Sequence, residues 1–90
     1  MEQEDYETAI RQLRAAAELV AAGVSENERM NAQGVRAFFM MKEARVHEAN
    51  RTQTSNDDLF RATASAALEM AGRKEYLAAA ALLEQARSLI

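Results

Sequence analysis

The sequence predicts a single all-α domain, residues 1–90, that contains four helices. Two observations carry this prediction. Proline is absent and only 3 Gly occur, while Ala, Glu, Arg, Leu and Met, which favour helices, are common. Apolar residues recur at intervals of three and four, as one face of an α-helix requires. No segment alternates apolar with polar residues over several positions, so no strand is expected.

The first two predicted helices cover residues 4–22 and 26–50. The first carries one apolar stripe at alternating spacings of four and three, formed by Tyr6, Ile10, Leu13, Ala17, Val20 and Val24. Gly23 suits the residue that follows a helix, because glycine adopts positive φ without a steric penalty. Ser25 and Glu28 have the spacing of a capping box, in which each side chain accepts from the backbone amide of the other residue. The short connection predicts an antiparallel pair.

The third and fourth predicted helices cover residues 57–71 and 73–89. The polar run 51–56 is the longest expected loop, and Thr54 or Ser55 is expected to cap the third helix. The expected inner face of that helix comprises Leu59, Phe60, Thr63, Ala66, Ala67 and Met70. Gly72 is expected to end it, in a tight turn that makes a second antiparallel hairpin. Two hairpins can pack as a bundle or as an orthogonal array.

The last predicted helix has a recognisable spacing. Tyr76, Ala79, Leu83 and Ala86 are separated by three, four and three residues. This spacing resembles the second half of a tetratricopeptide (TPR) motif, over about one repeat. Thr63 stands where that motif has a Trp-like residue. The resemblance implies a TPR-like hairpin that binds peptides or proteins and performs no chemistry.

The composition bounds the location of the chain. There is no Cys, so neither disulfides nor Cys-ligated metals are expected. No apolar run approaches the ~18 residues that a membrane span needs, and no apolar segment follows the acidic residues 1–5 as in a secretory signal. The expected location is therefore cytoplasmic, away from membranes, and a short chain without Cys or Pro suits bacteria or their phages.

Catalytic and metal-binding groups are sparse. His47 is the single histidine, and Glu43 precedes it by four residues, which places both on one face of a continuous helix. A di-metal bundle needs Glu-x-x-His motifs on two helices, which this sequence lacks. A nucleophile with a base and an orienting group is not evident either. We expect no enzyme activity, no cofactor and no metal.

Nucleic acid is a disfavoured partner. The net charge is −3 and the pI is about 5.1, whereas nucleic-acid-binding domains commonly exceed about 9. Basic residues do gather in the second predicted helix, although Glu residues lie among them. A DNA-binding regulator with a helix-turn-helix-like pair therefore stays the alternative function.

Four consecutive apolar residues, Phe38, Phe39, Met40 and Met41, point to all sides of the second predicted helix. Either that helix is the centre of the fold, or part of the cluster is exposed and marks a contact with another protein or with a second copy of the chain. The main functional hypothesis is a small protein–protein interaction module. Its expected contact surface includes the loop 51–56 and the helix residues Arg36, Phe38, Phe39, Met40, Met41, Lys42 and Arg45.

Overall fold

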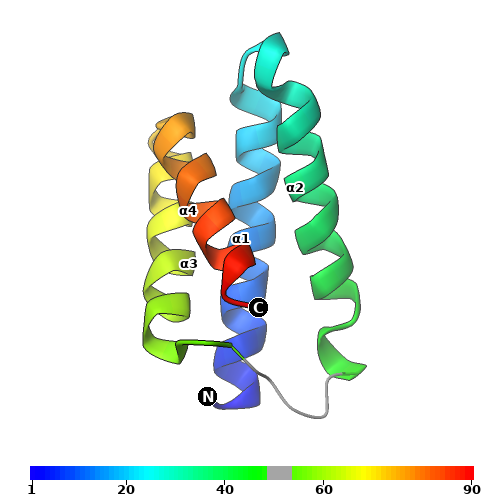
Figure 1. Ribbon diagram of the computed structural model, residues 1–90, viewed down its shortest axis with the longest axis vertical. Coiled ribbons are helices and arrows are strands. Elements are labelled where there is room, and N and C mark those ends of the chain that lie inside the picture. Colours follow the sequence, from blue (N-terminus) through cyan, green and yellow to red (C-terminus); the bar gives the residue numbers. More distant parts are fainter. Residues whose placement is uncertain (49–53) are drawn as a thin grey trace.

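The computed structural model describes residues 1–48 and 54–90. It contains four α-helices and one short 3-10 helix, η1 (Figure 1). In chain order these are α1 (Gln3–Gly23), α2 (Glu26–Ala44), η1 (Val46–Glu48), α3 (Asp57–Gly72) and α4 (Tyr76–Ser88). The described residues contain no strand, and the helices pack on one another over an extent of 38 × 21 × 18 Å. The prediction of four helices in an all-α fold is confirmed.

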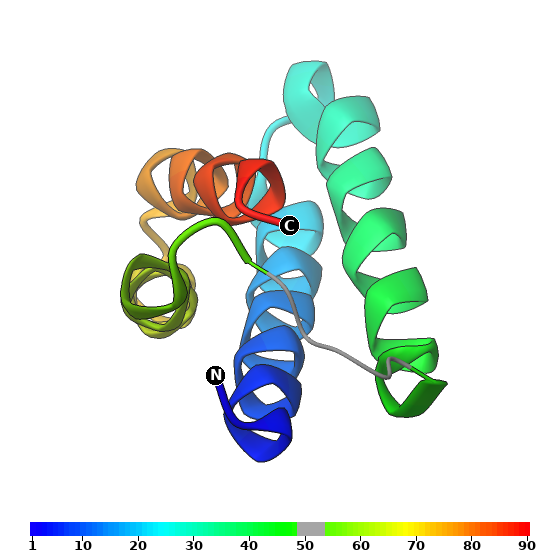
Figure 2. The same cartoon turned by 60° about the horizontal axis from the view of Figure 1, so that its bottom comes forward.

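Helix α1 is the central element. It packs against α2, α3 and α4, and α2 and α3 lie on opposite sides of it (Figures 1 and 2). Its predicted apolar stripe is buried throughout, and Ile10 and Leu13 have no exposed surface. Tyr6 stacks on Phe60 of α3, with 5.9 Å between the ring centroids. The core of the domain is therefore built around α1.

Helix α2 is peripheral, so the interpretation that placed it at the centre of the fold is wrong. Only Ala32, Val35 and Phe39 of this helix are buried. The expectation that it runs to residue 50 is also wrong, because it ends at Ala44. The following η1 buries Val46, whose carbonyl oxygen accepts a 2.9 Å hydrogen bond from Nε2 of Gln3. This contact turns the chain back onto α1. Residues 49 and 50 lie outside the described residues.

The N-terminal capping of α2 and α3 differs from that expected. Ser25 does precede α2, but its side chain makes no capping hydrogen bond, so the predicted capping box does not form. The amide of Glu28 donates to the carbonyl oxygen of Ser25 at 3.0 Å instead. Helix α3 is capped by Asn56, whose Oδ1 accepts from the amide of Leu59 at 3.0 Å. The expected caps, Thr54 and Ser55, lie too early in the chain for this role.

The glycines do not act as left-handed helix ends. Neither Gly23 nor Gly72 has a positive φ, and each is the last residue of its helix. The left-handed residue of the α3–α4 turn is Lys74, with φ 64°. Because this turn occupies residues 73–75, α4 begins at Tyr76 and not at the expected position 73.

Helices α3 and α4 form the second hairpin. The buried residues of α4 are Ala79, Leu83 and Ala86, which belong to its predicted stripe. The buried face of α3 comprises Phe60, Thr63, Ala64, Ala67 and Ala71. Leu59 was expected on this face, but 41% of its surface is exposed, because it lies about 100° around the helix from its buried neighbour Phe60.

The one buried polar side chain of the described core joins the two helices of this hairpin. The hydroxyl of Thr63 donates to the carbonyl oxygen of Leu59 at 2.6 Å and accepts from Nε2 of Gln85 at 2.8 Å. Its hydrogen-bonding capacity is thus satisfied, which is the condition for burying a hydroxyl without a large penalty.

Candidate functional site

An apolar groove lies between α2 and α4. Both helices pack on α1, and the floor is formed by Ala17 and Val20 of α1 and by Val24, which follows that helix. The groove runs along the N-terminal half of α2 and along α4 from Tyr76 to Glu84. The N-terminal ends of the two helices are far apart in Figure 1. It encloses a volume of about 210 Å³. The groove exists because α1 is long enough to hold two helices that diverge from each other.

The walls of the groove are mainly apolar. Ala32 and Val35 form the α2 side, and the α4 side is made by Tyr76, Leu77, Ala80 and Leu83. Leu77 is the most notable of these because 73% of its surface is exposed. Leu77 extends the apolar walls of the groove toward solvent, and contiguous exposed apolar surface is a feature of protein contacts.

The rim of the groove is polar and acidic. Its polar side chains are Asn27, Glu28 and Asn31 from α2 and Glu84 from α4. No Lys or Arg is among the described residues that line the groove. The rim therefore presents negative charge around an apolar floor.

Phe38 of α2 is partly buried beside α4 and does not line the groove. Its ring meets the ring of Phe39 edge to face, with 5.0 Å between centroids and 89° between planes. The guanidinium of Arg87 on α4 lies 5.4 Å from the centroid of the Phe38 ring, and Nζ of Lys42 lies 5.5 Å from it. The cation–π contact with Arg87 connects α2 to the C-terminal part of α4, whereas the contact with Lys42 lies within α2.

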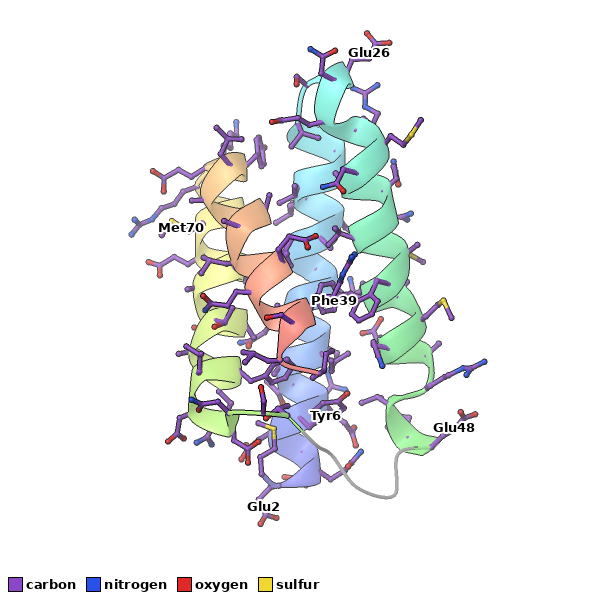
Figure 3. All side chains as sticks on the ribbon, viewed as in Figure 1. Glu2, Tyr6, Glu26, Phe39, Glu48 and Met70 are labelled. Atoms are coloured by element: carbon purple, nitrogen blue, oxygen red, sulfur yellow. The ribbon has the colours of Figure 1, made fainter. Side chains whose placement is uncertain are left out.

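The structure separates the contact residues that were expected in α2. Phe39 points toward α1 (Figure 3) and has no exposed surface, so it belongs to the core. Met40 and Met41 are 40% and 60% exposed, and Phe38 is partly buried beside α4. Successive residues of a helix differ by about 100° in direction, which explains why four neighbours have three different surroundings.

The expected charged rim of that surface is partly engaged within the chain. Nη2 of Arg36 lies 3.9 Å from Oε1 of Glu18 on α1, and Lys42 lies over Phe38. Arg45 is exposed and follows the last residue of α2. Of the expected loop 51–56, residues 51–53 lie outside the described residues.

The groove is not evident from the sequence. Leu77 falls outside the stripe that begins at Tyr76, and Val35 is one apolar residue among many in its helix. The signal that was available is Leu77 itself, an apolar residue directly beside the inner stripe of α4. The pairing of the α2 and α4 walls depends on how both helices cross α1, which no local pattern indicates.

Glu43 and His47, which were expected on one face of a continuous helix, belong to different elements. Helix α2 ends between them, and each meets α1 separately. Glu43 pairs with Arg14, at 2.9 Å between Oε1 and Nε, and Nδ1 of His47 lies 3.6 Å from Oε2 of Glu7. Within residues 1–48 and 54–90, no three His, Cys, Asp or Glu side chains are grouped to hold a metal ion.

None of the helices in the described parts of the chain is both long and apolar enough to cross a membrane. Comparison of the chain with family models, with curated proteins and with solved structures gives no match.

Proposed function

We propose that this protein is a small binding module that receives an apolar segment of a partner protein in the groove between α2 and α4. The observation that carries the proposal is the apolar lining of this groove on three helices, with Leu77 exposed at its mouth. An amphipathic helix laid into a groove, with apolar side chains at positions i, i+3, i+4 and i+7, is a common mode of peptide recognition. The proposal assigns a binding role and no reaction.

The size of the groove supports a protein segment over a small molecule. Its volume of about 210 Å³ is below the roughly 300–1,000 Å³ that is typical of small-molecule sites. A few apolar side chains of a partner fill such a volume, while the rest of the partner lies over the rim. The absence of Cys gives the chain no disulfide suited to an oxidising compartment, which supports a cytoplasmic location.

The charge of the rim indicates the kind of partner. Glu28 and Glu84 flank the apolar walls on opposite sides. A partner helix with Lys or Arg beside its apolar stripe places opposite charges against both carboxylates, whereas an acidic helix is repelled. The same charge disfavours DNA in this groove.

The test uses two synthetic amphipathic helices with the same leucine stripe, one flanked by Lys and the other by Glu. We expect the Lys peptide to bind, with chemical-shift changes in the NMR spectrum at Val20, Val35 and Ala80. Leu77→Ser is expected to weaken binding by about tenfold, since the loss of one buried apolar anchor costs about 1–3 kcal/mol.

Leu59→Ser is the matched control, because Leu59 is likewise an exposed leucine in the first turn of a helix but lies on α3, outside the groove. It should leave binding of the Lys peptide unchanged. Equal binding of both peptides, or shift changes that avoid the groove, would contradict the proposal.

A further inference from the structure

Helix α2 has a second apolar face that nothing in the described chain covers. Four of its residues follow one another at spacings of four, three and four, and we call them the outer stripe: Met30, Gly34, Ala37 and Met41. At 100° per residue they point away from Ala32, Val35 and Phe39, which face α1. Met30 is 88% and Met41 60% exposed, and Gly34 and Ala37 are exposed as well. In Figures 1 and 2, α2 lies at the edge of the molecule.

We propose that the outer stripe is the seam of a symmetric homodimer, in which α2 of one copy packs antiparallel against α2 of a second copy. This proposal concerns a different face of α2 from the groove and does not depend on the proposed function. The second copy is indicated by three properties of the stripe: its symmetry, its glycine and the charges at its ends.

The order of side chains in the stripe is the same in both directions. It reads large, small, small, large, with symmetric spacings. A two-fold axis that crosses the stripe midway between Gly34 and Ala37 therefore places Met30 against Met41 of the second copy and Gly34 against its Ala37. A two-fold interface must be complementary to itself in this manner. The methionines then cover the small residues from both ends, and their flexible side chains adapt to the contact.

Gly34 has no role within the single chain. It lies in the middle of α2 without a positive φ, and a Cβ added there would meet no atom within 4 Å. Glycine at such a position destabilises a helix relative to alanine. Close approach of a second helix backbone explains why the smallest residue stands at the centre of this exposed stripe.

The charges at the ends of α2 favour the antiparallel orientation. Glu26 lies in its first turn, whereas Lys42 and Arg45 lie at its C-terminal end. An antiparallel pair brings Glu26 of each copy to the level of Arg45 of the other copy, and it also opposes the two helix dipoles favourably. A parallel pair would align like charges at both ends. The positions that flank the stripe are uncharged: Asn31, Gln33, Phe38 and Met40.

The expected dimer is weak. The seam covers roughly three turns of one helix in each copy, which puts it among the small interfaces of less than about 1,200 Å² that form transient contacts. The groove stays open in this dimer, because its α2 wall, with Ala32 and Val35, faces α1 and α4.

The oligomeric state of the full chain tests the proposal. Sedimentation equilibrium from about 1 μM to about 1 mM should show a monomer–dimer equilibrium. Gly34→Gln places a bulky side chain at the centre of the seam and should raise the dissociation constant at least about tenfold. Its helix content should stay unchanged, because the side chain meets open space in the monomer. Gly72→Gln is the matched control, since Gly72 also has open space around it, and it should dimerise like the unchanged protein.

The orientation has its own test, because the chain contains no Cys. An equal mixture of the Met30→Cys and Met41→Cys proteins should form the mixed 30–41 disulfide in preference to either homodisulfide. Glu26→Lys should weaken the dimer, and the double variant Glu26→Lys/Arg45→Glu should restore it.

A protein that stays monomeric at about 1 mM, or a folded Gly34→Gln variant that dimerises as well as the Gly72→Gln control, would overturn the proposal. Preferred 30–30 and 41–41 disulfides would overturn the antiparallel arrangement. These results leave the groove untouched, so failure of the dimer and failure of peptide binding are distinguishable.

Discussion

The ring of Tyr76 lies in the space that a side chain at Gly23 would occupy. A Cβ built on Gly23 would overlap Cζ, Cε2 and the hydroxyl oxygen of Tyr76. The last residue of α1 is therefore a glycine because the first residue of α4 packs directly over its backbone. Tyr76 also lines the groove, so this contact helps to define the position of the α4 wall.

Replacement of Gly23 by Ala should destabilise the protein by about 1–3 kcal/mol, because the Tyr76 ring must move away. Gly34→Ala is the control, since it adds the same methyl group in open space within a helix. At low protein concentration it should stabilise the chain by about 0.4–1 kcal/mol. Urea unfolding measures both values. Gly23→Ala should matter only when Tyr76 is present, so it is also measured in the Tyr76→Ala variant. If it changes the free energy of unfolding by the same amount there as in the unchanged protein, Gly23 and Tyr76 are not energetically coupled.

Phe39 and Met41 should respond very differently to truncation although they are two residues apart. Phe39→Ala removes a fully buried ring and should cost about 3–5 kcal/mol. That is a large part of the roughly 5–13 kcal/mol expected for a domain of this length. Met41→Ala changes an exposed side chain and should stay within about 0.5 kcal/mol. Thermal unfolding at micromolar protein concentration measures both variants. An equal loss of stability in the two would mean that Met41 belongs to the core as Phe39 does.

Asp57 should make stability depend on pH in the acid range. Its Oδ2 accepts a hydrogen bond from the amino group of Met1 at 2.8 Å, and Oδ1 accepts one from the hydroxyl of Thr54. These bonds, the one from the Met1 amine foremost, lower the pKa of the Asp57 carboxyl below its ordinary 3.8. The folded state thus favours the carboxylate, and its contribution is present above pH 3.8 and is lost as the pH falls through the lowered pKa.

Asp57→Asn should accordingly lower the melting temperature at pH 7, and the difference from the unchanged protein should shrink as the pH falls below 3.8. Asp58→Asn is the control at the neighbouring position, where the carboxylate is 91% exposed and pairs with Arg61 at 2.8 Å. A constant difference between pH 7 and strongly acidic solution would show that Asp57 acts through packing and not through its charge.

Arg14 should contribute through the geometry of its guanidinium as well as through its charge. Nε and Nη2 donate to the two carboxylate oxygens of Glu43 at 2.9 and 3.3 Å, and Nη1 donates to Glu18 at 3.2 Å. The hydrogen bond to Glu43 is the main cause that raises the pKa of Arg14. Arg14→Lys keeps the charge but loses the two-pronged contact, and should cost up to about 1 kcal/mol.

A double-mutant cycle of Arg14→Lys with Glu43→Gln, followed by urea unfolding, measures this coupling. It should fall when salt is raised, because both side chains are partly exposed. If the effects of the two substitutions on the free energy of unfolding are additive, the interaction between Arg14 and Glu43 does not stabilise the protein.

Much of the fold was accessible from local patterns. The stripe that begins at Tyr6 is the buried face of α1, and the stripe of Ala79, Leu83 and Ala86 is the buried face of α4. These predictions are confirmed because burial of one helix face leaves a period of 3.6 residues in the sequence. Helix α2 carries a weaker signal, since its buried residues and its outer stripe are both apolar, and Phe38–Met41 joins the two faces into one cluster.

The ends of the helices were harder to predict than their faces. A capping motif at Ser25 and a glycine at position 72 are compatible with several local geometries, and the packed structure selects among them. Asn56 caps α3 although Thr54 and Ser55 are equally suitable residue types. Helix α2 ends early because the following η1 buries Val46. The carbonyl oxygen of Val46 accepts a hydrogen bond from the side chain of Gln3, forty-three residues away along the chain.

The sequence by itself determined that this chain forms four helices and which faces of α1 and α4 are buried, because helix propensity and apolar periodicity are local properties. Only the tertiary structure decided that α1 is central, that α2 is peripheral, and that Phe39 is core while Met41 is surface. It also decided where the groove lies. These outcomes depend on how helices cross one another, and a crossing angle is set by side chains that are distant in the sequence.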